Sequence, residues 1–174
     1  MCQSVPRKLY LSGVLFLCLL LPACGQVTDQ AYALLLKGLY SHTVPVIPAA
    51  KLKPLLEKET HPVLLDTRSE KEYHVSHLTG AKLVNYDNFD LAQLKDVPKD
   101  TPIVVYCSVG YRSEKIGERL QQAGYSRVQN LYGGLFEWVN QGHPVYNQQG
   151  KTNQVHAYSK SWGVWLRKGE KVYD

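Results

Sequence analysis

The sequence YCSVGYRSEKIGERL, at residues 106–120, is the most informative segment for predicting the fold. It continues an apolar run at residues 103–106 and leads into a segment in which Ile116 and Leu120 share one helical face. Gly124 then supplies a natural helix stop. A buried strand, a short polar loop and an amphipathic helix follow one another here, which is the repeating unit of an α/β fold.

Short apolar segments alternate with helical ones along most of the chain. We expect strands at residues 44–47, 63–65, 81–84, 103–106 and 128–131. We expect helices at residues 28–40, 48–58, 67–73, 113–124 and 135–139, with a brief helical turn at residues 91–94. Strands separated by helices form a parallel sheet with helices on both faces. The predicted fold class is therefore α/β.

The overall composition is that of a globular protein. The chain has 174 residues, of which 44% are hydrophobic and 20% are charged. This balance suits one domain of about 100–150 residues with appendages. The formal net charge is +5, and the basic residues are scattered rather than gathered with aromatic residues into a stripe. We therefore expect no nucleic-acid partner.

The first 23 residues have the organisation of an export signal. Two basic residues precede an uncharged run at residues 9–21, which is too short for a membrane span of about 20 residues but suits a signal-peptide core. Residues 21–24, LPAC, resemble a bacterial lipobox, in which Cys24 becomes the lipidated first residue. The alternative is ordinary cleavage after Gly25. We expect an exported protein of the cell envelope or periplasm, anchored to the membrane by lipid on Cys24.

Cysteine usage directs attention to residue 107. The chain has four cysteines, and removal of the signal together with lipidation of Cys24 leaves Cys107 as the one free thiol of the mature protein. A lone cysteine in an exported protein is either an inert buried residue or a reactive one. Cys107 follows a predicted parallel strand directly, and the carboxyl ends of such strands form the edge where α/β sheets bind ligands.

The loop after Cys107 is suited to stabilising an anion. Residues 108–112 can turn successive backbone N–H groups inward, and Gly110 can adopt the positive φ that such a turn requires. The following helix presents the positive end of its dipole, and Arg112 adds a cation. These features favour a thiolate over a thiol, so we expect Cys107 to be a nucleophile.

The segment 107–113 resembles the C-x-x-G-x-R active-site loop of the rhodanese-type sulfurtransferases. Flanking segments are similar to other motifs of that family, in the same order: LDTR (65–68), EY (72–73), HLTGA (77–81), YGGLFEW (132–138) and GHPV (142–145). The chain departs from the pattern at Ser76, where the family often has glycine. The resemblance covers about residues 43–146.

This resemblance implies a rhodanese-like sheet of about five parallel strands and sulfur transfer through a persulfide. Cys107 is the implied catalytic residue, which takes the outer sulfur of a donor such as thiosulfate. The sulfur then passes to cyanide, a small thiol or a cysteine of a partner protein, and no cofactor is implied. The implied substrate-binding residues are Ser108, Val109, Gly110, Tyr111 and Arg112.

Roles can also be assigned to Arg112 and to the pair Asp66 and Arg68. We expect Arg112 to orient an anionic donor, with a local ion pair to Glu114 or Glu118 as the alternative. We expect Asp66 and Arg68 to hold the loop framework together as a buried pair.

The histidines carry no metal prediction. His74, His77 and His143 lack metal-ligand spacing with cysteines or carboxylates, so no metal site is expected. His77 is expected to form a hydrogen bond with backbone within the framework. Gly133-Gly134 lacks the lysine and serine of a phosphate loop and is interpreted as a tight strand-to-helix turn.

Four segments organise the chain: a lipoprotein-type signal peptide (1–23), an N-terminal linker and helix (24–42), the rhodanese-like domain (43–149) and an aromatic C-terminal extension (150–174). We favour packing of the extension over a sheet edge or helix face, because large aromatic residues bury much surface. The alternative is a wall beside the active-site mouth or a docking surface.

Two rival functions are considered. Phosphatases with a related loop use C-x5-R, whereas Cys107 and Arg112 are spaced as C-x4-R, and the smaller ring favours sulfur transfer over phosphate chemistry. The second rival is a non-enzymatic module that binds an anion or a partner protein. Such modules often lose the cysteine, which this chain retains.

Overall fold

The computed structural model describes residues 21–174, with side chains from residue 29 onward. Residues 1–20 of the predicted signal peptide and the side chain of Cys24 lie outside the described part. The chain divides into two compact units, residues 1–37 and 38–174. Within the residues that the structure describes, no helix combines the length and apolarity needed to cross a membrane.

Helix α2, Leu21–Leu39, accounts for the described part of the first unit. The sequence predicted a helix at residues 28–40, and the observed helix includes residues 28–39 of that range.

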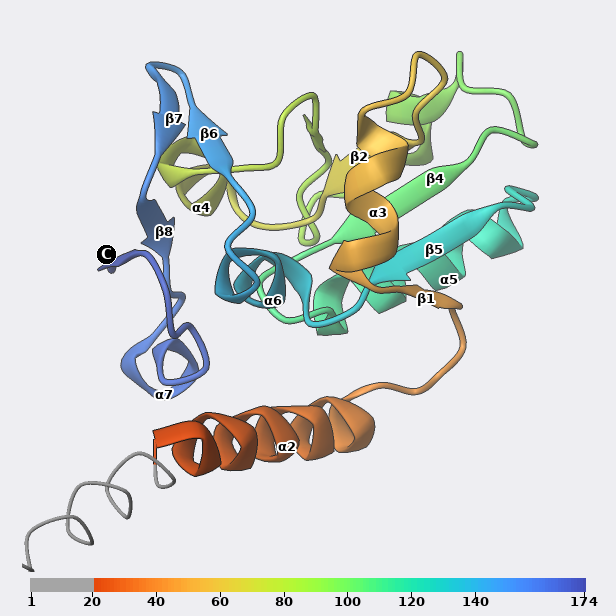
Figure 1. The fold of residues 1–174 in the computed structure, drawn as a ribbon. Helices are drawn as coiled ribbons and strands as arrows, with labels where there is room; N and C mark the ends of the chain where they lie inside the picture. The colour runs from red at the N-terminus through yellow and green to blue at the C-terminus, as the bar shows by residue number, and fades with distance from the viewer. Residues whose placement is uncertain (1–20) are drawn as a thin grey trace, which may run out of the picture. The chain divides into compact units, whose positions relative to one another are not determined.

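A five-stranded parallel sheet forms the centre of the second unit (Figure 1). Its strands lie in the order β1-β5-β4-β2-β3 and pair in parallel throughout. Their bounds are β1 (Val46–Ile47), β2 (Val63–Asp66), β3 (Lys82–Leu83), β4 (Ile103–Tyr106) and β5 (Val128–Leu131). All five predicted strands form, with the edge strands β1 and β3 shorter than predicted. The α/β prediction is confirmed.

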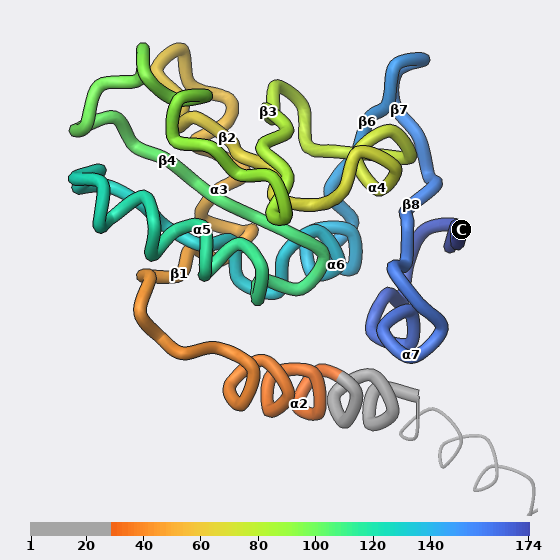
Figure 2. The backbone as a smooth tube through the Cα atoms, turned by 180° about the vertical axis from the view of Figure 1, so that it is seen from behind, coloured from red at the N-terminus to blue at the C-terminus, as the bar shows by residue number. Residues whose placement is uncertain are grey.

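Helices cover both faces of the sheet. They are α3 (Ala49–Leu56), α4 (Glu70–Val75), the 3-10 helix η1 (Leu91–Leu94), α5 (Tyr111–Gln122) and α6 (Gly134–Asn140). Figures 1 and 2, which view the molecule from opposite sides, show α3 on one face and α5 on the other. Each helix follows a strand, as the alternating sequence pattern predicted.

The central strand β4 is the most buried part of the sheet. All four of its residues are buried, because helices cover the sheet on both sides. On the α5 side, Val105 packs in a cluster with Leu65, Ile116 and Leu120. The apolar face that the helical spacing predicted is therefore the one that α5 buries.

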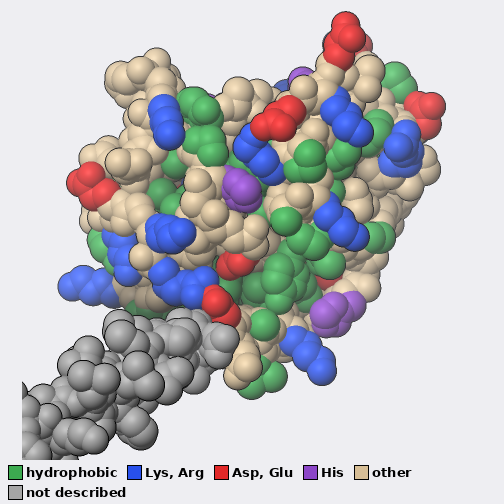
Figure 3. Space-filling model, in the orientation of Figure 1, with side chains coloured by type: hydrophobic (Ala, Val, Ile, Leu, Met, Phe, Trp, Pro, Cys, Tyr) green, Lys and Arg blue, Asp and Glu red, His purple; other side chains and the backbone are tan. Residues whose placement is uncertain are grey.

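The C-terminal segment adds two small sheets and a short helix. Strands β6 (Val145–Asn147) and β7 (Gly150–Thr152) form an antiparallel hairpin that crosses the predicted start of the extension. Strands β8 (Gln154–His156) and β9 (Glu170–Val172) pair in parallel, with α7 (Lys160–Gly163) between them. Strand β8 packs against α4. On the face shown in Figure 3, basic and acidic side chains are interspersed.

Candidate active site

Cys107 lies at the carboxyl end of β4, at the first position of a short loop that we call the cysteine loop (residues 107–110). The thiol side chain is buried, with 1% exposed. Helix α5 begins at Tyr111, two residues earlier than the predicted Ser113. The early start is possible because Gly110 caps the helix with a φ of 107°, a left-handed conformation that a residue with a side chain rarely adopts.

Helix α6 holds the first half of the cysteine loop by its carbonyl groups. The backbone N–H of Leu135 donates to the Cys107 carbonyl at 2.8 Å, and that of Phe136 donates to the Ser108 carbonyl at 3.0 Å. These donors belong to the first turn of α6, where N–H groups lack partners within the helix. Gly134 permits the approach, because a Cβ atom there would lie 2.4 Å from the Cys107 carbonyl oxygen.

The second half of the loop is held by two side chains from other elements. The Tyr40 hydroxyl donates to the Val109 carbonyl at 2.7 Å, and Asn130 Nδ2 donates to the Gly110 carbonyl at 2.9 Å. All four loop carbonyls thus accept hydrogen bonds from outside the loop. The backbone N–H of Gly110 is directed at Cys107 Sγ, 3.1 Å away, as a donor that stabilises negative charge on sulfur.

Tyr40 also joins the cysteine loop to the turn before α6. Its hydroxyl accepts a hydrogen bond from the Gly133 backbone N–H at 2.9 Å while donating to Val109. Burial raises the pKa of Tyr40, so the hydroxyl keeps the proton that it donates. A Cβ atom on Gly110 would collide with this hydroxyl, so the position of Tyr40 requires glycine at residue 110.

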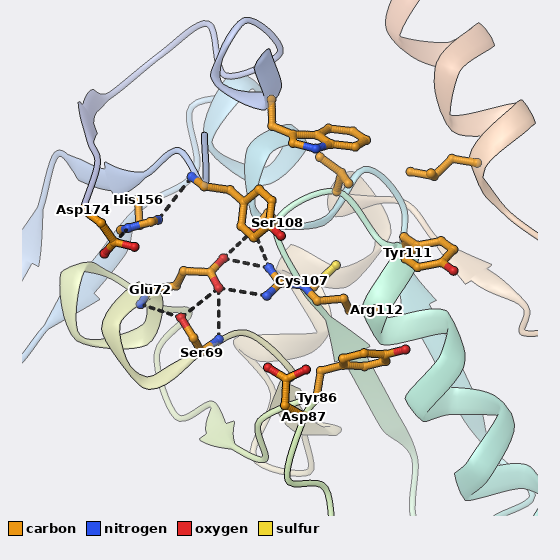
Figure 4. A pocket seen from close by; sticks show the side chains of 14 residues that line it. Ser69, Glu72, Tyr86, Asp87, Cys107, Ser108, Tyr111, Arg112, His156 and Asp174 are labelled. Atoms are coloured by element: carbon orange, nitrogen blue, oxygen red, sulfur yellow. Dashed lines mark hydrogen bonds and ion pairs between the residues drawn. The ribbon is translucent and has the colours of Figure 1, made fainter. Parts of the chain in front are cut away.

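Arg112 forms a two-pronged ion pair with Glu72 of α4. Its Nη1 lies 2.9 Å from Glu72 Oε2 and its Nη2 lies 2.7 Å from Oε1, and Nη2 also lies 3.1 Å from Ser108 Oγ (Figure 4). Ser108 Oγ donates to the same carboxylate at 2.9 Å. Glu72 Oε2 also accepts a hydrogen bond from the Ser69 backbone N–H, because Ser69 and Glu72 form the capping box of α4.

The predicted alternative for Arg112, a local pair with Glu114 or Glu118, is wrong. Glu114 accepts hydrogen bonds from the backbone N–H groups of Ser41 and Thr43. Glu118 instead forms an ion pair with Lys115. Both carboxylates project from α5 toward other partners, whereas the arginine reaches across to α4.

The electrostatics of the pair keep both groups charged. Burial alone would raise the pKa of Glu72, but hydrogen bonds and charge from Arg112, aided by Arg68, lower it from 4.5 to about 2. Burial alone would lower the pKa of Arg112, but hydrogen bonding and charge from Glu72, together with the nearby Cys107, hold it above its ordinary value. Arg112 therefore acts on two groups at once, the Glu72 carboxylate and the Cys107 sulfur.

Asp66 and Arg68 form a fully buried pair away from the pocket. Arg68 Nη2 lies 2.6 Å from Asp66 Oδ2, and both side chains are 0% exposed. The same nitrogen donates to the Ser76 carbonyl at 2.5 Å, which ties the end of β2 to the end of α4. His77 Nδ1 lies 2.9 Å from the Tyr73 carbonyl, so this histidine also contacts backbone.

A pocket of about 520 Å³ opens beside the cysteine loop (Figure 4). Its lining includes Cys107 and four of the five predicted substrate-binding residues: Ser108, Val109, Tyr111 and Arg112. Gly110 is the exception, since it lies behind the sulfur against Tyr40.

The C-terminal extension forms part of this pocket. His156, Tyr158, Trp162 and Asp174 line it. The extension does pack over a helix face, as the favoured interpretation expected, because β8 packs against α4. The alternative of a wall beside the pocket also applies, because residues of the same extension line the pocket. Sequence could not separate the two, because both interpretations rest on the same aromatic residues.

Several contacts around the cysteine loop were not predicted from the sequence. Tyr40 and Asn130 lie 69 and 20 residues from the loop carbonyls that they hold, and nothing in local pattern marks either. Glu72 stood within a recognised motif, and the capping-box spacing after Ser69 was a second available signal. Its pairing with Arg112, 40 residues away, required the fold.

Comparison with known proteins supports this assignment of the fold. The rhodanese-like domain family matches residues 48–141. A rhodanese-like domain from Anabaena, solved by solution NMR, is 28% identical with a TM-score of 0.54 and covers 59% of this chain and 79% of its own.

Two curated relatives are named for different activities. The probable adenylyltransferase/sulfurtransferase MoeZ of Mycobacterium tuberculosis is 30% identical over 122 residues, 70% of this chain and 29% of that protein. The tRNA uridine(34) hydroxylase of Protochlamydia amoebophila is 36% identical over 93 residues, 49% of this chain and 29% of that protein. The chain thus spans under a third of the length of these two relatives. With its cysteine loop, its parallel sheet and a family match over more than half of its length, the chain belongs to the rhodanese-like domain family.

Proposed function

We propose that this protein is a sulfurtransferase that carries sulfane sulfur on Cys107. The observation that carries the proposal is the geometry at Sγ: the Gly110 backbone N–H points at the sulfur, and Arg112 lines the same pocket as Cys107. A buried cysteine that served packing alone would need neither donor. The sulfurtransferase in the name of the mycobacterial relative agrees with this reading.

The reaction divides into two half-reactions. The Cys107 thiolate attacks the outer sulfur of a donor, the bond between that sulfur and the rest of the donor breaks, and the leaving group departs with the electron pair. With thiosulfate as donor, sulfite leaves and Cys107 carries a persulfide. An acceptor nucleophile, such as cyanide or a thiolate, then attacks the outer sulfur and releases the Cys107 thiolate.

The loaded enzyme must discharge to an external acceptor. Of the four cysteines in the sequence, Cys2, Cys18 and Cys24 lie in or next to the predicted signal. No cysteine of the folded domain other than Cys107 is therefore present to resolve the persulfide as an internal disulfide. The donor loads sulfur onto Cys107 before the acceptor removes it, so we expect ping-pong kinetics.

Mass spectrometry of the intact protein tests the proposal directly. After incubation with a sulfane donor and removal of the excess, we expect the mass to rise by one sulfur atom, located on the peptide that contains Cys107. Cyanide should return the mass to its starting value and yield thiocyanate, which controls for non-specific oxidation. An unchanged mass with every donor tried would favour a binding module instead.

We further propose that the protein is exported and held at a membrane by lipid on Cys24. The LPAC segment behind an apolar run supports this proposal. Full-length protein made in bacteria should partition into detergent, and Cys24→Ser should move it to the aqueous phase. Wild-type protein that is already aqueous and begins at Gln26 would establish cleavage after Gly25.

A further inference from the structure

The pocket wall supplied by the extension is built at a conformational cost. Tyr158 adopts a φ of 64°, in the left-handed region that a residue with a side chain occupies at about 1–2 kcal/mol. The residue is 52% exposed, so burial in a core does not offset that cost. Observed strain of this kind points to a positional role for the residue.

Neighbouring groups hold Tyr158 in this conformation. The Tyr158 backbone N–H donates to His156 Nδ1 at 3.1 Å, and the next N–H, of Ser159, donates to the Ala157 carbonyl at 2.8 Å. His156 is itself buried, and its Nε2 lies 3.4 Å from Asp174 (Figure 4). The result places the Tyr158 ring 5.1 Å from the Arg112 guanidinium carbon, a cation–π distance.

The charges around the pocket do not favour a dianion. The Arg112 cation is already paired with Glu72, and the carboxylates of Asp87 and Asp174 line the same pocket. Asp174 faces His156 and, at 3.6 Å, Lys71, so its charge is partly offset. Because Glu72 neutralises Arg112 and Asp87 adds a further negative charge, the pocket leaves little net attraction for a dianion such as thiosulfate.

The size and lining of the pocket suit an organic group. Its volume of about 520 Å³ lies within the roughly 300–1,000 Å³ of pockets that hold small organic ligands. Four aromatic residues contribute to the lining: Tyr86, Tyr111, Tyr158 and Trp162. Inorganic donors have no carbon atoms with which these rings could make contact.

We propose that Tyr158 and Trp162 form a specificity wall that selects an organic sulfane donor, with an aromatic or apolar group R, over thiosulfate. This inference rests on the proposed sulfurtransferase function and names the class of its donor, R–SO2–S⁻ or R–S–SH. The R group lies against the two rings while the sulfane sulfur reaches Cys107.

The transfer from such a donor balances in atoms and charge. The Cys107 thiolate attacks the terminal sulfur of R–SO2–S⁻, the sulfur–sulfur bond breaks, and the sulfinate R–SO2⁻ leaves with the electron pair. The products are the Cys107 persulfide anion and the sulfinate, and no outside oxidant or reductant takes part. With R–S–SH the leaving group is the thiolate R–S⁻.

Three donors with related reactive ends test the wall: p-toluenethiosulfonate, methanethiosulfonate and thiosulfate, each with cyanide as acceptor. The first two carry the same charge and differ only in the R group. We expect wild-type kcat/KM to be highest for p-toluenethiosulfonate, by roughly tenfold or more over methanethiosulfonate, since an aromatic group is buried. Tyr158→Ala and Trp162→Ala should each reduce that preference by roughly three- to tenfold, with methanethiosulfonate changed less than the aromatic donor.

Two control variants separate the wall from a general loss of structure. Tyr158→Phe keeps the ring and should keep the preference, and Val164→Ala removes an exposed side chain of the extension that is not among the pocket residues. If the wild type and both alanine variants accept sulfur from all three donors with the same preference for the aromatic donor, the specificity wall is overturned. The proposed sulfurtransferase function would still stand. Transfer from none of the three would overturn the proposed function itself.

Discussion

Cys107→Ser is expected to abolish sulfur transfer from every donor, by roughly a thousandfold or more in kcat. A serine hydroxyl is not ionised at neutral pH, and it cannot hold sulfane sulfur in a bond that an acceptor thiolate readily cleaves. The measurement is thiocyanate formation from a sulfane donor and cyanide, together with the mass of the protein after donor treatment. Neither product nor mass increase should appear.

The fold should survive this substitution. Serine is close to cysteine in shape, and its oxygen can accept the hydrogen bond that the Gly110 N–H now donates to Sγ. The thermal unfolding midpoint of Cys107→Ser should therefore stay close to that of the wild type, which shows that activity is lost through chemistry. Sulfur transfer by a folded Cys107→Ser protein would remove Cys107 from the mechanism.

Glu72→Gln is expected to lower the free energy of unfolding by about 3 kcal/mol at pH 7. The Glu72 carboxylate accepts from the capping serine of α4, from Ser108 and from both ends of the Arg112 guanidinium. The glutamine amide keeps the shape of the side chain, but its NH2 group would face groups that are themselves hydrogen-bond donors. The substitution also leaves Arg112 without a counter-charge. Urea unfolding measures the loss, and sulfur transfer should fall with it because Arg112 loses its fixed position.

Acid should erase the difference between Glu72→Gln and the wild type. The pKa of Glu72 is lowered from 4.5 to about 2 by the fold, so the unfolded chain binds a proton more readily than the folded one. The stabilisation is therefore fully present above about pH 4.5 and is lost progressively as the pH falls toward 2. The two unfolding free energies should converge over that range.

Glu70→Gln is the matched control for this experiment. Glu70 lies in the first turn of the same helix and is exposed, so its loss should change the free energy of unfolding by no more than about 0.5 kcal/mol. If Glu72→Gln were no more destabilising than Glu70→Gln, the ion pair with Arg112 would not anchor the cysteine loop.

Local pattern was sufficient wherever a feature depended on neighbours in sequence. The strand–loop–helix order around Cys107 follows from an apolar run, a glycine and a helical face, all within about 20 residues, and the sheet confirms it. The start of α5 was placed two residues late, because the helix begins at the residue that Gly110 caps and the apolar face begins later. Periodicity marks the buried face of a helix, whereas backbone conformation marks its first residue.

Pairings between distant residues followed a different rule. The alternative expected for Arg112 was a local pair with Glu114 or Glu118 on its own helix, but the ion pair that forms is with Glu72 on α4. For a long side chain such as arginine, the sequence offers several carboxylates as possible partners. Burial selects among them, because a charge removed from water needs the partner that offers the most hydrogen bonds.

The class of fold, the cysteine proposed as nucleophile and its position at the carboxyl edge of a parallel sheet could all be predicted from the sequence. Each depends on residue types at short spacing. The surroundings of the sulfur could be read only from the folded structure: Tyr40 and Asn130 on the loop carbonyls, Glu72 paired with Arg112, and the Tyr158 ring beside the Arg112 guanidinium. These residues come from elements far apart in the chain, and the packing of those elements around one sheet edge brings their side chains together.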